Sequence, residues 1–264
     1  RDFCLSRGLG DVYKRQADKG GLNFTYKWNM GWMHDFLDYM SLDPYFRKNN
    51  HHKMTFAMSY NNSEKYILVL SHDEVVHGKA TIIQKMSGDY EEKFPQARAM
   101  YMYMYAHPGK KLNFMGNEIA QFREWDEKRQ QDWEILKFPK HKEFHHFMME
   151  LNNVYEAHPA LWEADYAQDG FRWIDCHQEE KCIYAFERKS KKERIVAVFH
   201  FGNTGEQEYT MKISDAKKLK LIYSSDDTEM KKGHPEYQKD LTVKKGQISM
   251  LLPAYSARFY QVEK

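Results

Sequence analysis

A histidine and an aspartate stand together at the end of a short apolar run, and this pair is the chemically most informative feature of the chain. The run from Tyr66 to Leu70 has the length and composition of a buried strand, and His72 and Asp73 follow it almost directly. In barrels of parallel strands, the loops at the carboxyl ends converge on one open face and carry the reacting groups. The sequence therefore predicts a functional edge at His72 and Asp73. The alternative is a loop pair that only caps the next helix.

The elements that must position this pair follow a strand, loop and helix rhythm from Gly20 to about Pro159. Two apolar stripes recur at steps of three and four residues, which is the period of a helix face that packs on a core. Turn residues such as Pro108 and Gly109 end the first helix before the next strand. The stripes consist of Phe94, Ala97, Tyr101 and Met104, and of Phe144, Phe147, Met148, Leu151 and Tyr155.

After Pro159 the pattern changes to short β-branched or alternating runs that are separated by turn signals, which is typical of antiparallel sheets. About 100 residues of this kind predict a β-sandwich. The expected strands cover residues 182–186, 195–201, 209–213, 219–223 and 248–252.

Composition narrows the class of protein. The 264 residues include 40 basic and 38 acidic side chains, so the net charge of +2 gives no sign of a nucleic-acid partner. No apolar run approaches the ~20 residues that span a bilayer, so no membrane partner is predicted either. Three cysteines, Cys4, Cys176 and Cys182, do not form an even extracellular framework, and we expect a cytoplasmic protein.

No cofactor is predicted, because the chain has no phosphate loop, nucleotide fingerprint or paired-cysteine motif. No metal is predicted either, because the histidines lack the spacing of zinc ligands. We interpret the adjacent pairs His51–His52 and His145–His146 as solvent-exposed side chains.

Three segments carry a resemblance to the glycogen branching enzymes of the alpha-amylase superfamily. Ser71–Lys79 resembles the fourth signature region of that superfamily, in the form that branching enzymes carry. Phe24–Asp35 resembles the sixth strand of their (β/α)8 barrel with the following loop, and Lys111–Glu118, followed by Gln121–Asp126, resembles the eighth strand and its end. The resemblance implies an α/β plus all-β chain: the C-terminal part of a barrel, strands six to eight only, followed by an antiparallel β-sandwich.

The resemblance also implies a reaction. Branching enzymes cleave an alpha-1,4 link of glycogen or another alpha-glucan and transfer the segment to a 6-hydroxyl, by a retaining double displacement. Asp73 is expected to be the third acid, which hydrogen-bonds the distorted sugar and stabilises the transition state, and His72 to donate to hydroxyls of the same ring. Substrate-binding residues are expected at Trp28, Met30, Trp32, Glu74, His77, Lys79 and Glu118.

The nucleophile and the general acid belong to barrel strands four and five in this superfamily, and neither has a counterpart in the chain. We therefore expect the chain to be inactive by itself. The segment Gly170–Asp175 resembles the nucleophile motif G-F-R-x-D, but it has one residue too many and lies in the all-β half. Asp175 is assigned no catalytic role. The alternatives are another hydrolase or transferase of the superfamily, and a non-catalytic glucan-binding module.

The domain boundaries follow from these expectations: a leader at 1–16, barrel units at 17–160 and the all-β domain at 161–264. The leader resembles translated adapter sequence, and we expect it not to belong to the fold. Three barrel units cannot close. We therefore expect two unpaired sheet edges, uncovered apolar helix faces, and aggregation or partial order when the chain is expressed alone.

Overall fold

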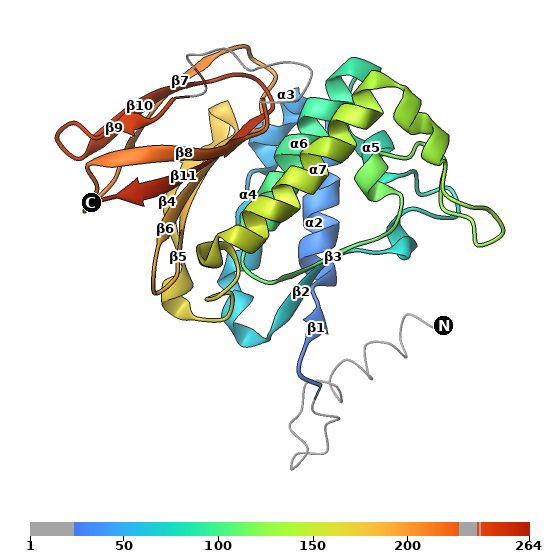
Figure 1. The fold of residues 1–264 in the computed structure, drawn as a ribbon, viewed down its shortest axis with the longest axis horizontal. Coiled ribbons are helices and arrows are strands. Elements are labelled where there is room, and N and C mark those ends of the chain that lie inside the picture. Colours follow the sequence, from blue (N-terminus) through green and yellow to red (C-terminus); the bar gives the residue numbers. More distant parts are fainter. Residues whose placement is uncertain (1–23, 227–236, 238) are drawn as a thin grey trace.

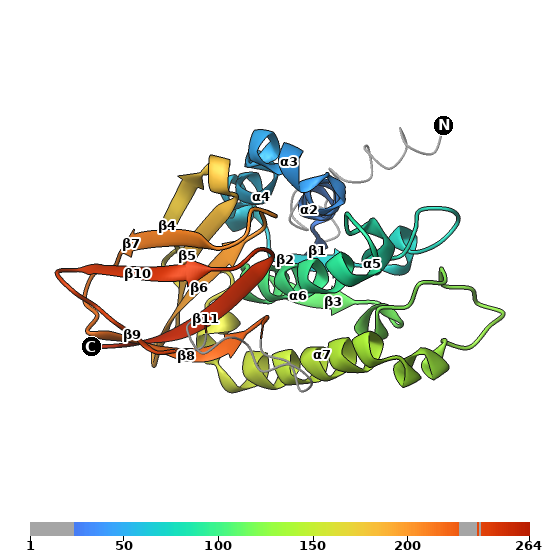
Figure 2. The same cartoon turned by 90° about the horizontal axis from the view of Figure 1, so that it is seen from above.

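The computed structural model describes residues 24–226, 237 and 239–264, and the expected leader at residues 1–16 lies outside them. Within this part a small parallel sheet and a layer of helices pack against a larger antiparallel β structure (Figure 1). Seen from above, the antiparallel strands lie on the left, and the helices lie beside them together with the parallel strands (Figure 2).

The parallel sheet contains β1 (Lys27–Trp28), β2 (Tyr66–Leu70) and β3 (Lys110–Asn113), in that order. The predicted strand at 66–70 is therefore confirmed to the residue. β2 is central, and three of its five side chains are fully buried, as expected for an apolar strand between two neighbours. Among the described residues, β1 and β3 each pair with one strand only, so both outer edges of this sheet are unpaired.

Six α-helices connect and cover these strands. Asn29 caps α2 by accepting a hydrogen bond from the Trp32 amide at 2.9 Å, and Asp89 and Glu92 form a reciprocal capping box at the start of α6. The two predicted apolar stripes lie on α6 and α7. The described α-helices are α2 (Met30–Ser41), α3 (Pro44–Arg47), α4 (His52–Thr55), α5 (Ile82–Lys85), α6 (Tyr90–Ala106) and α7 (Pro139–Ala157).

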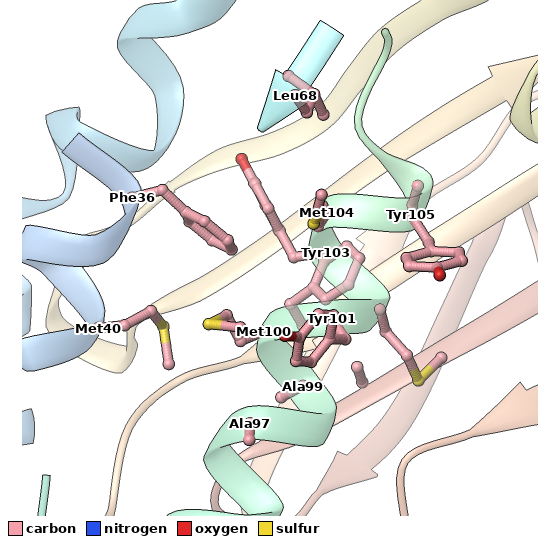
Figure 3. Close-up of a cluster of buried hydrophobic side chains, with 14 of the residues drawn as sticks. Phe36, Met40, Leu68, Ala97, Ala99, Met100, Tyr101, Tyr103, Met104 and Tyr105 are labelled. Atoms are coloured by element: carbon pink, nitrogen blue, oxygen red, sulfur yellow. The ribbon is translucent and has the colours of Figure 1, made fainter. Parts of the chain in front are cut away.

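Helix α6 is buried on all sides from Gln96 to Ala106, which its stripe alone did not predict. Figure 3 shows Phe36 and Met40 of α2 and Leu68 of β2 beside its side chains. From the β-rich half, Phe186 and Phe199 approach the Tyr103 ring to 5.7 and 5.0 Å between ring centroids. The expectation of uncovered helix faces is therefore wrong for α6, because the large antiparallel sheet covers the face that the parallel sheet leaves open.

The C-terminal half is the expected antiparallel sandwich. Its larger sheet has the order β4-β5-β6-β11-β8-β9, and β10 pairs with β7 in a second sheet. Apolar side chains from both sheets meet in one buried cluster, among them Val196 of β6 and Met250 of β10. The strands are β4 (Phe171–Gln178), β5 (Ile183–Lys189), β6 (Arg194–His200), β7 (Gln207–Lys212), β8 (Lys218–Ser224), β9 (Leu241–Thr242), β10 (Gln247–Leu252) and β11 (Ser256–Glu263).

Strand β11 was not predicted, although it lies between β6 and β8 in the larger sheet. Its sequence places Ser256 and Arg258 among apolar residues, and such polar side chains argue against a central strand. In the fold both are buried, and Arg258 donates a hydrogen bond to the Leu251 carbonyl at 2.8 Å. The guanidinium of Arg258 is tolerated in a central strand because the carbonyl seven residues earlier accepts from one of its nitrogens and the Asp226 carboxylate lies 3.6 Å from another.

Candidate functional site

His72 and Asp73 lie in a short 3-10 turn that begins two residues after β2 ends. Their side chains are about half exposed, at 47% and 50%, and the imidazole Nε2 lies 3.1 Å from the Asp73 carboxylate. Phe114 and Trp125 flank the imidazole, with ring centroids 5.7 and 6.1 Å away. The backbone N–H of Phe114 donates to the Leu70 carbonyl, so the ends of β2 and β3 lie side by side. The pair therefore faces solvent at the carboxyl edge of the sheet.

The loop that carries the pair has a costly backbone shape. His77 and Ala80 adopt the left-handed region with φ of 56° and 63°, which costs roughly 1–2 kcal/mol for each residue that is not glycine. Gly78 lies between them with φ of 81°. Such a loop keeps one conformation only if other parts of the chain hold it.

Two charged side chains hold this loop. The ammonium group of Lys85 donates to the backbone carbonyls of Glu74, Lys79 and Ala80, each at 2.6 Å. The carboxylate of Glu124 accepts from the backbone N–H groups of Gly78 and Ala80, both at 2.8 Å. Those two hydrogen bonds lower the pKa of Glu124, whereas burial lowers the pKa of Lys85. We call Lys85 and Glu124 the loop brace.

The loop brace was missed as a functional element from sequence alone. Glu124 lies within a segment that resembles the family, but its partners are 44 and 46 residues earlier. Hydrogen bonds over such separations leave no periodic signal in a single sequence. The only available sign was a charged residue beside an aromatic one after the third strand.

Three predicted contact residues share this loop. Glu74 is 8% exposed, and its carboxylate lies 3.7 Å from the Lys79 ammonium. This burial and pairing favour a role in supporting the loop over contact with a polymer. His77 and Lys79 are exposed. The structure therefore leaves His77 and Lys79 accessible to a ligand and encloses Glu74.

Trp28, Met30 and Trp32, the three substrate-binding residues predicted near the first strand, have different surroundings in the fold. Trp28 ends β1 and is 42% exposed, and it pairs in register with Ile67, about 10 Å before the end of β2 at 3.3 Å per residue. Met30 begins α2 and packs against the core. Trp32 is only 2% exposed and stacks on Phe36 at 4.7 Å. The prediction that Trp32 binds substrate is therefore corrected, because the core encloses its ring.

Glu118 follows β3 in a 3-10 turn and is partly exposed. Within the described part of the chain it forms no hydrogen bond or ion pair. The pKa of the Tyr101 phenol is raised mainly by burial and next by Tyr105, and the charge of Glu118 adds to this rise. The structure therefore does not connect Glu118 with His72 and Asp73.

The structure also places His51 and Asp175. His51 is 7% exposed and stacks on Tyr184 at 4.2 Å, so its interpretation as a solvent-exposed side chain is wrong. Asp175 lies on β4, where its carboxylate accepts hydrogen bonds from the His177 amide and the Tyr209 hydroxyl. These contacts connect β4 with β7, and the absence of a catalytic role for Asp175 stays a prediction.

Over residues 24–226, 237 and 239–264, no group of three or more histidine, cysteine or acidic residues could hold a metal ion. In the same ranges, none of the helices has the length and apolar character that crossing a bilayer requires. Cys176 and Cys182 are free thiols.

The loop brace leads to a prediction that does not depend on any catalytic role. Replacing Glu124 with alanine should release the amides of Gly78 and Ala80, which then lose protection in hydrogen-exchange mass spectrometry of this loop. Because the pKa of Glu124 is lowered in the fold, its stabilisation is present above the ordinary glutamate value of about 4.3 and is lost as the pH falls through the lowered pKa. Protection in the unaltered protein should therefore decrease at acidic pH.

The matched control is Glu127→Ala, which removes an exposed carboxylate three residues away that does not bond to this loop. Exchange in the loop should be unchanged in that variant. Equal exchange in the Glu124→Ala variant and the unaltered protein would show that Glu124 does not hold the loop.

Two kinds of comparison with known proteins, one with a family model and one with curated relatives, agree with this geometry. Residues 173–263 match the family described as alpha amylase, C-terminal all-beta domain. The 1,4-alpha-glucan branching enzyme GlgB 1 of Clostridium perfringens is 49% identical over 216 residues, which cover 81% of this chain and 32% of that protein. The corresponding enzyme of Oceanobacillus iheyensis is 44% identical over 80% of this chain and 33% of its own length.

Solved structures show the same fold at low identity. A crystal structure of an Anoxybacillus alpha-amylase matches with a TM-score of 0.64 and 15% identity, over 93% of this chain and 48% of that one. A debranching enzyme of Nostoc punctiforme matches with a TM-score of 0.62 and 15% identity, over 92% of this chain and 47% of that one. The chain spans about a third of the length of the curated relatives it matches. These comparisons confirm the resemblance to branching enzymes.

Proposed function

We propose, from the resemblance to 1,4-alpha-glucan branching enzymes over 81% of the chain, that this chain is part of such an enzyme. The parent protein would cleave an alpha-1,4 link and transfer the released segment to a 6-hydroxyl of glycogen or a related alpha-glucan. The observation that carries the proposal is the half-exposed pair His72 and Asp73, which a braced loop holds at the carboxyl edge of a parallel sheet.

In the proposed reaction a carboxylate from outside this chain attacks C1 of the donor sugar as the bond from C1 to O4 breaks. A second acid, also from outside this chain, protonates the leaving oxygen. The 6-hydroxyl of the acceptor then attacks C1, releases the enzyme carboxylate and gives its proton to the second acid. Asp73 and His72 would hydrogen-bond the hydroxyls of the sugar while positive charge develops at its ring, which favours the transition state over the bound substrate.

The neighbouring residues have supporting roles in this proposal. Lys85 and Glu124 position the loop, and His77 and Lys79 are exposed beside the pair. Trp28 presents part of its ring at the end of β1 and could contact the polymer further along the sheet. We propose no cofactor and, from the cysteine content, a cytoplasmic location.

The test uses the parent protein, with amylose as substrate. Branching creates new alpha-1,6 links, seen as their anomeric proton signal in NMR spectra, and leaves the number of reducing ends unchanged. A hydrolase of the same superfamily would instead raise the number of reducing ends. Loss of amylose with new reducing ends and without alpha-1,6 links would refute the branching proposal. The present chain alone should form no alpha-1,6 links, because its nucleophile and general acid are proposed to lie elsewhere in the parent.

A further inference from the structure

The side chain of Lys85 ends in a cradle of three backbone carbonyl oxygens. Its ammonium group donates to the carbonyls of Glu74, Lys79 and Ala80, each at 2.6 Å. An ammonium group has three N–H donors and no acceptor, so the cradle satisfies all of its donors. Over residues 24–226, 237 and 239–264, no other group donates to these three oxygens. The carbonyls and the cation therefore depend on each other.

The backbone shape of the loop directs two of these carbonyls to one point. Successive carbonyl groups alternate in direction along an extended chain, but they point the same way through a residue with helical dihedral angles of either hand. Ala80 lies between the carbonyl of Lys79 and its own, and its φ of 63° is in the left-handed region. This conformation lets both carbonyls reach the same ammonium. The strained residue is therefore part of a group of oxygens that binds a positive charge.

The charges around the cradle also suit a cation. Burial lowers the pKa of Lys85, and the negative charges of Glu74 and Glu124 oppose that fall. Ala80 is bound on both sides, because its N–H donates to the Glu124 carboxylate and its carbonyl accepts from the Lys85 ammonium. Backbone carbonyls that converge on one point are the ligands with which channel filters replace the water around a potassium ion. The oxygens of this cradle are therefore of the kind that a monovalent cation prefers.

The cation reaches the cradle from a fixed support. Lys85 ends α5, and a capping box between Thr81 and Gln84 begins that short helix. Lys93 of α6 donates to the backbone carbonyls of Gln84 and Met86, on either side of Lys85. A second lysine therefore fastens α5 to α6, and Lys85 carries that support to the loop after β2.

The cradle includes the residue that follows Asp73. Glu74 shares a 3-10 turn with His72 and Asp73, so Lys85 binds the carbonyl of the residue next to the proposed transition-state acid. Movement of that carbonyl would move Asp73 with it. Misplacement of a reacting group by about 1 Å can lower a rate by about 10²-fold.

We propose that Lys85 is the built-in cation of a monovalent cation site in the loop after β2, and that this cation positions Asp73. When the side chain is shortened, a free ammonium or potassium ion occupies the same three oxygens. Lys85 is a positioning residue, since it acts through the loop backbone. The cation site rests on the geometry of the cradle, whereas the positioning of Asp73 for a reaction rests on the proposed function.

The test is chemical rescue of the Lys85→Ala variant of the parent protein. The amides of residues 74–80 should exchange faster with solvent, and the kcat of branching should fall by about 10²-fold with little change in KM. Lys85 is partly exposed at the end of a short helix, so the fold should persist. Ammonium chloride should reverse both changes along a saturation curve. Tetramethylammonium chloride at the same concentrations should reverse neither, because this ion has no N–H to donate.

Two further variants separate the cation from the rest of the side chain. Lys85→Met keeps an apolar stem in the same space but carries no charge. Its loop should exchange fast, and ammonium should not slow that exchange. Lys142→Ala removes an exposed lysine of α7, outside the loop and its cradle. This matched control should keep the loop exchange and the kcat of the unaltered protein, with or without ammonium.

The outcomes distinguish the cation site from the proposed function. Slow loop exchange in the Lys85→Ala and Lys85→Met variants, no recovery with ammonium, or equal recovery with both salts would overturn the cation site. If the unaltered protein forms no alpha-1,6 links but ammonium restores slow exchange in the Lys85→Ala variant, the cation site stands and the branching proposal fails. If the unaltered protein forms these links and the Lys85→Ala variant keeps its full kcat, branching stands and the positioning role fails.

Discussion

Replacing Asp73 with asparagine should lower the kcat of glucan branching in the parent protein by about 10²–10³-fold, the loss typical of one group that stabilises a transition state. The amide has nearly the same shape as the carboxylate, but it carries no negative charge to oppose the positive charge that develops on the sugar. The KM for amylose should change much less, because an interaction that strengthens only in the transition state affects kcat. Initial rates of alpha-1,6 link formation over a range of amylose concentrations measure both quantities.

The fold should survive this substitution. The Asp73 side chain is half exposed and its ion-pair partner is the neighbouring His72, so unfolding free energy should change by no more than about 0.5 kcal/mol. Glu127→Gln is the matched control, since it neutralises an exposed carboxylate without touching the pair, and it should keep full activity. Normal kcat in the Asp73→Asn variant, or a defect confined to KM, would remove Asp73 from the proposed mechanism.

Replacing Asp165 with alanine should reduce the free energy of unfolding by about 3–5 kcal/mol, the usual cost of breaking a buried ion pair on one side. Asp165 is 2% exposed, and its carboxylate accepts from the Arg188 guanidinium at 2.8 Å and the Lys110 ammonium at 3.0 Å. Arg188 is fully buried and would lose its counter-charge. Unfolding of the parent protein followed by calorimetry should show the loss as a lower Tm for the transition that includes this region.

The pKa of Asp165 also indicates that its charged form stabilises the fold. Burial alone would raise the pKa of this carboxyl, but Lys111 and Arg188 outweigh burial and hold it below the ordinary value. The stabilisation is therefore present above the ordinary aspartate pKa of about 3.9 and is lost as the pH falls through the lowered value. The surroundings are dry enough that burial lowers the pKa of Lys111 to about 7.

A neighbouring carboxylate supplies the control for this prediction. Asp169 lies 3.9 Å from the Lys189 ammonium, and its side chain is 80% exposed. Asp169→Ala should change stability by less than about 1 kcal/mol, because water screens exposed pairs. Equal losses for the Asp165→Ala and Asp169→Ala variants would show that the buried pair has no special contribution.

Arg188 also shows why this contact matters for the architecture. From β5 it donates to the Ala106 carbonyl at the end of α6 and to the Gly170 carbonyl before β4. With Asp165 and Lys110 it joins the parallel sheet, the helix layer and the β-rich half in one network. Nothing in the local pattern around Arg188 or Asp165 indicated this role, because the partners of Arg188 lie 18 to 82 residues away from it in sequence.

The sequence by itself determined the local elements and the position of the chemically important pair. The apolar run Tyr66–Leu70 and the polar residues after it were sufficient to predict a strand with His72 and Asp73 at its carboxyl end. The stripes on α6 and α7 and five of the strands of the β-rich half also follow from periodicity, because helices repeat every 3.6 residues and strands every two.

Only the tertiary structure decided which side chains are covered and which segments hold the loop after β2. Trp32 and His51 are enclosed by residues distant in sequence, and the loop after β2 keeps its shape through Glu124. Periodicity reports which residues of one element share a face, but burial and hydrogen bonding depend on the elements that pack against that face, and those contacts exist only in the folded chain.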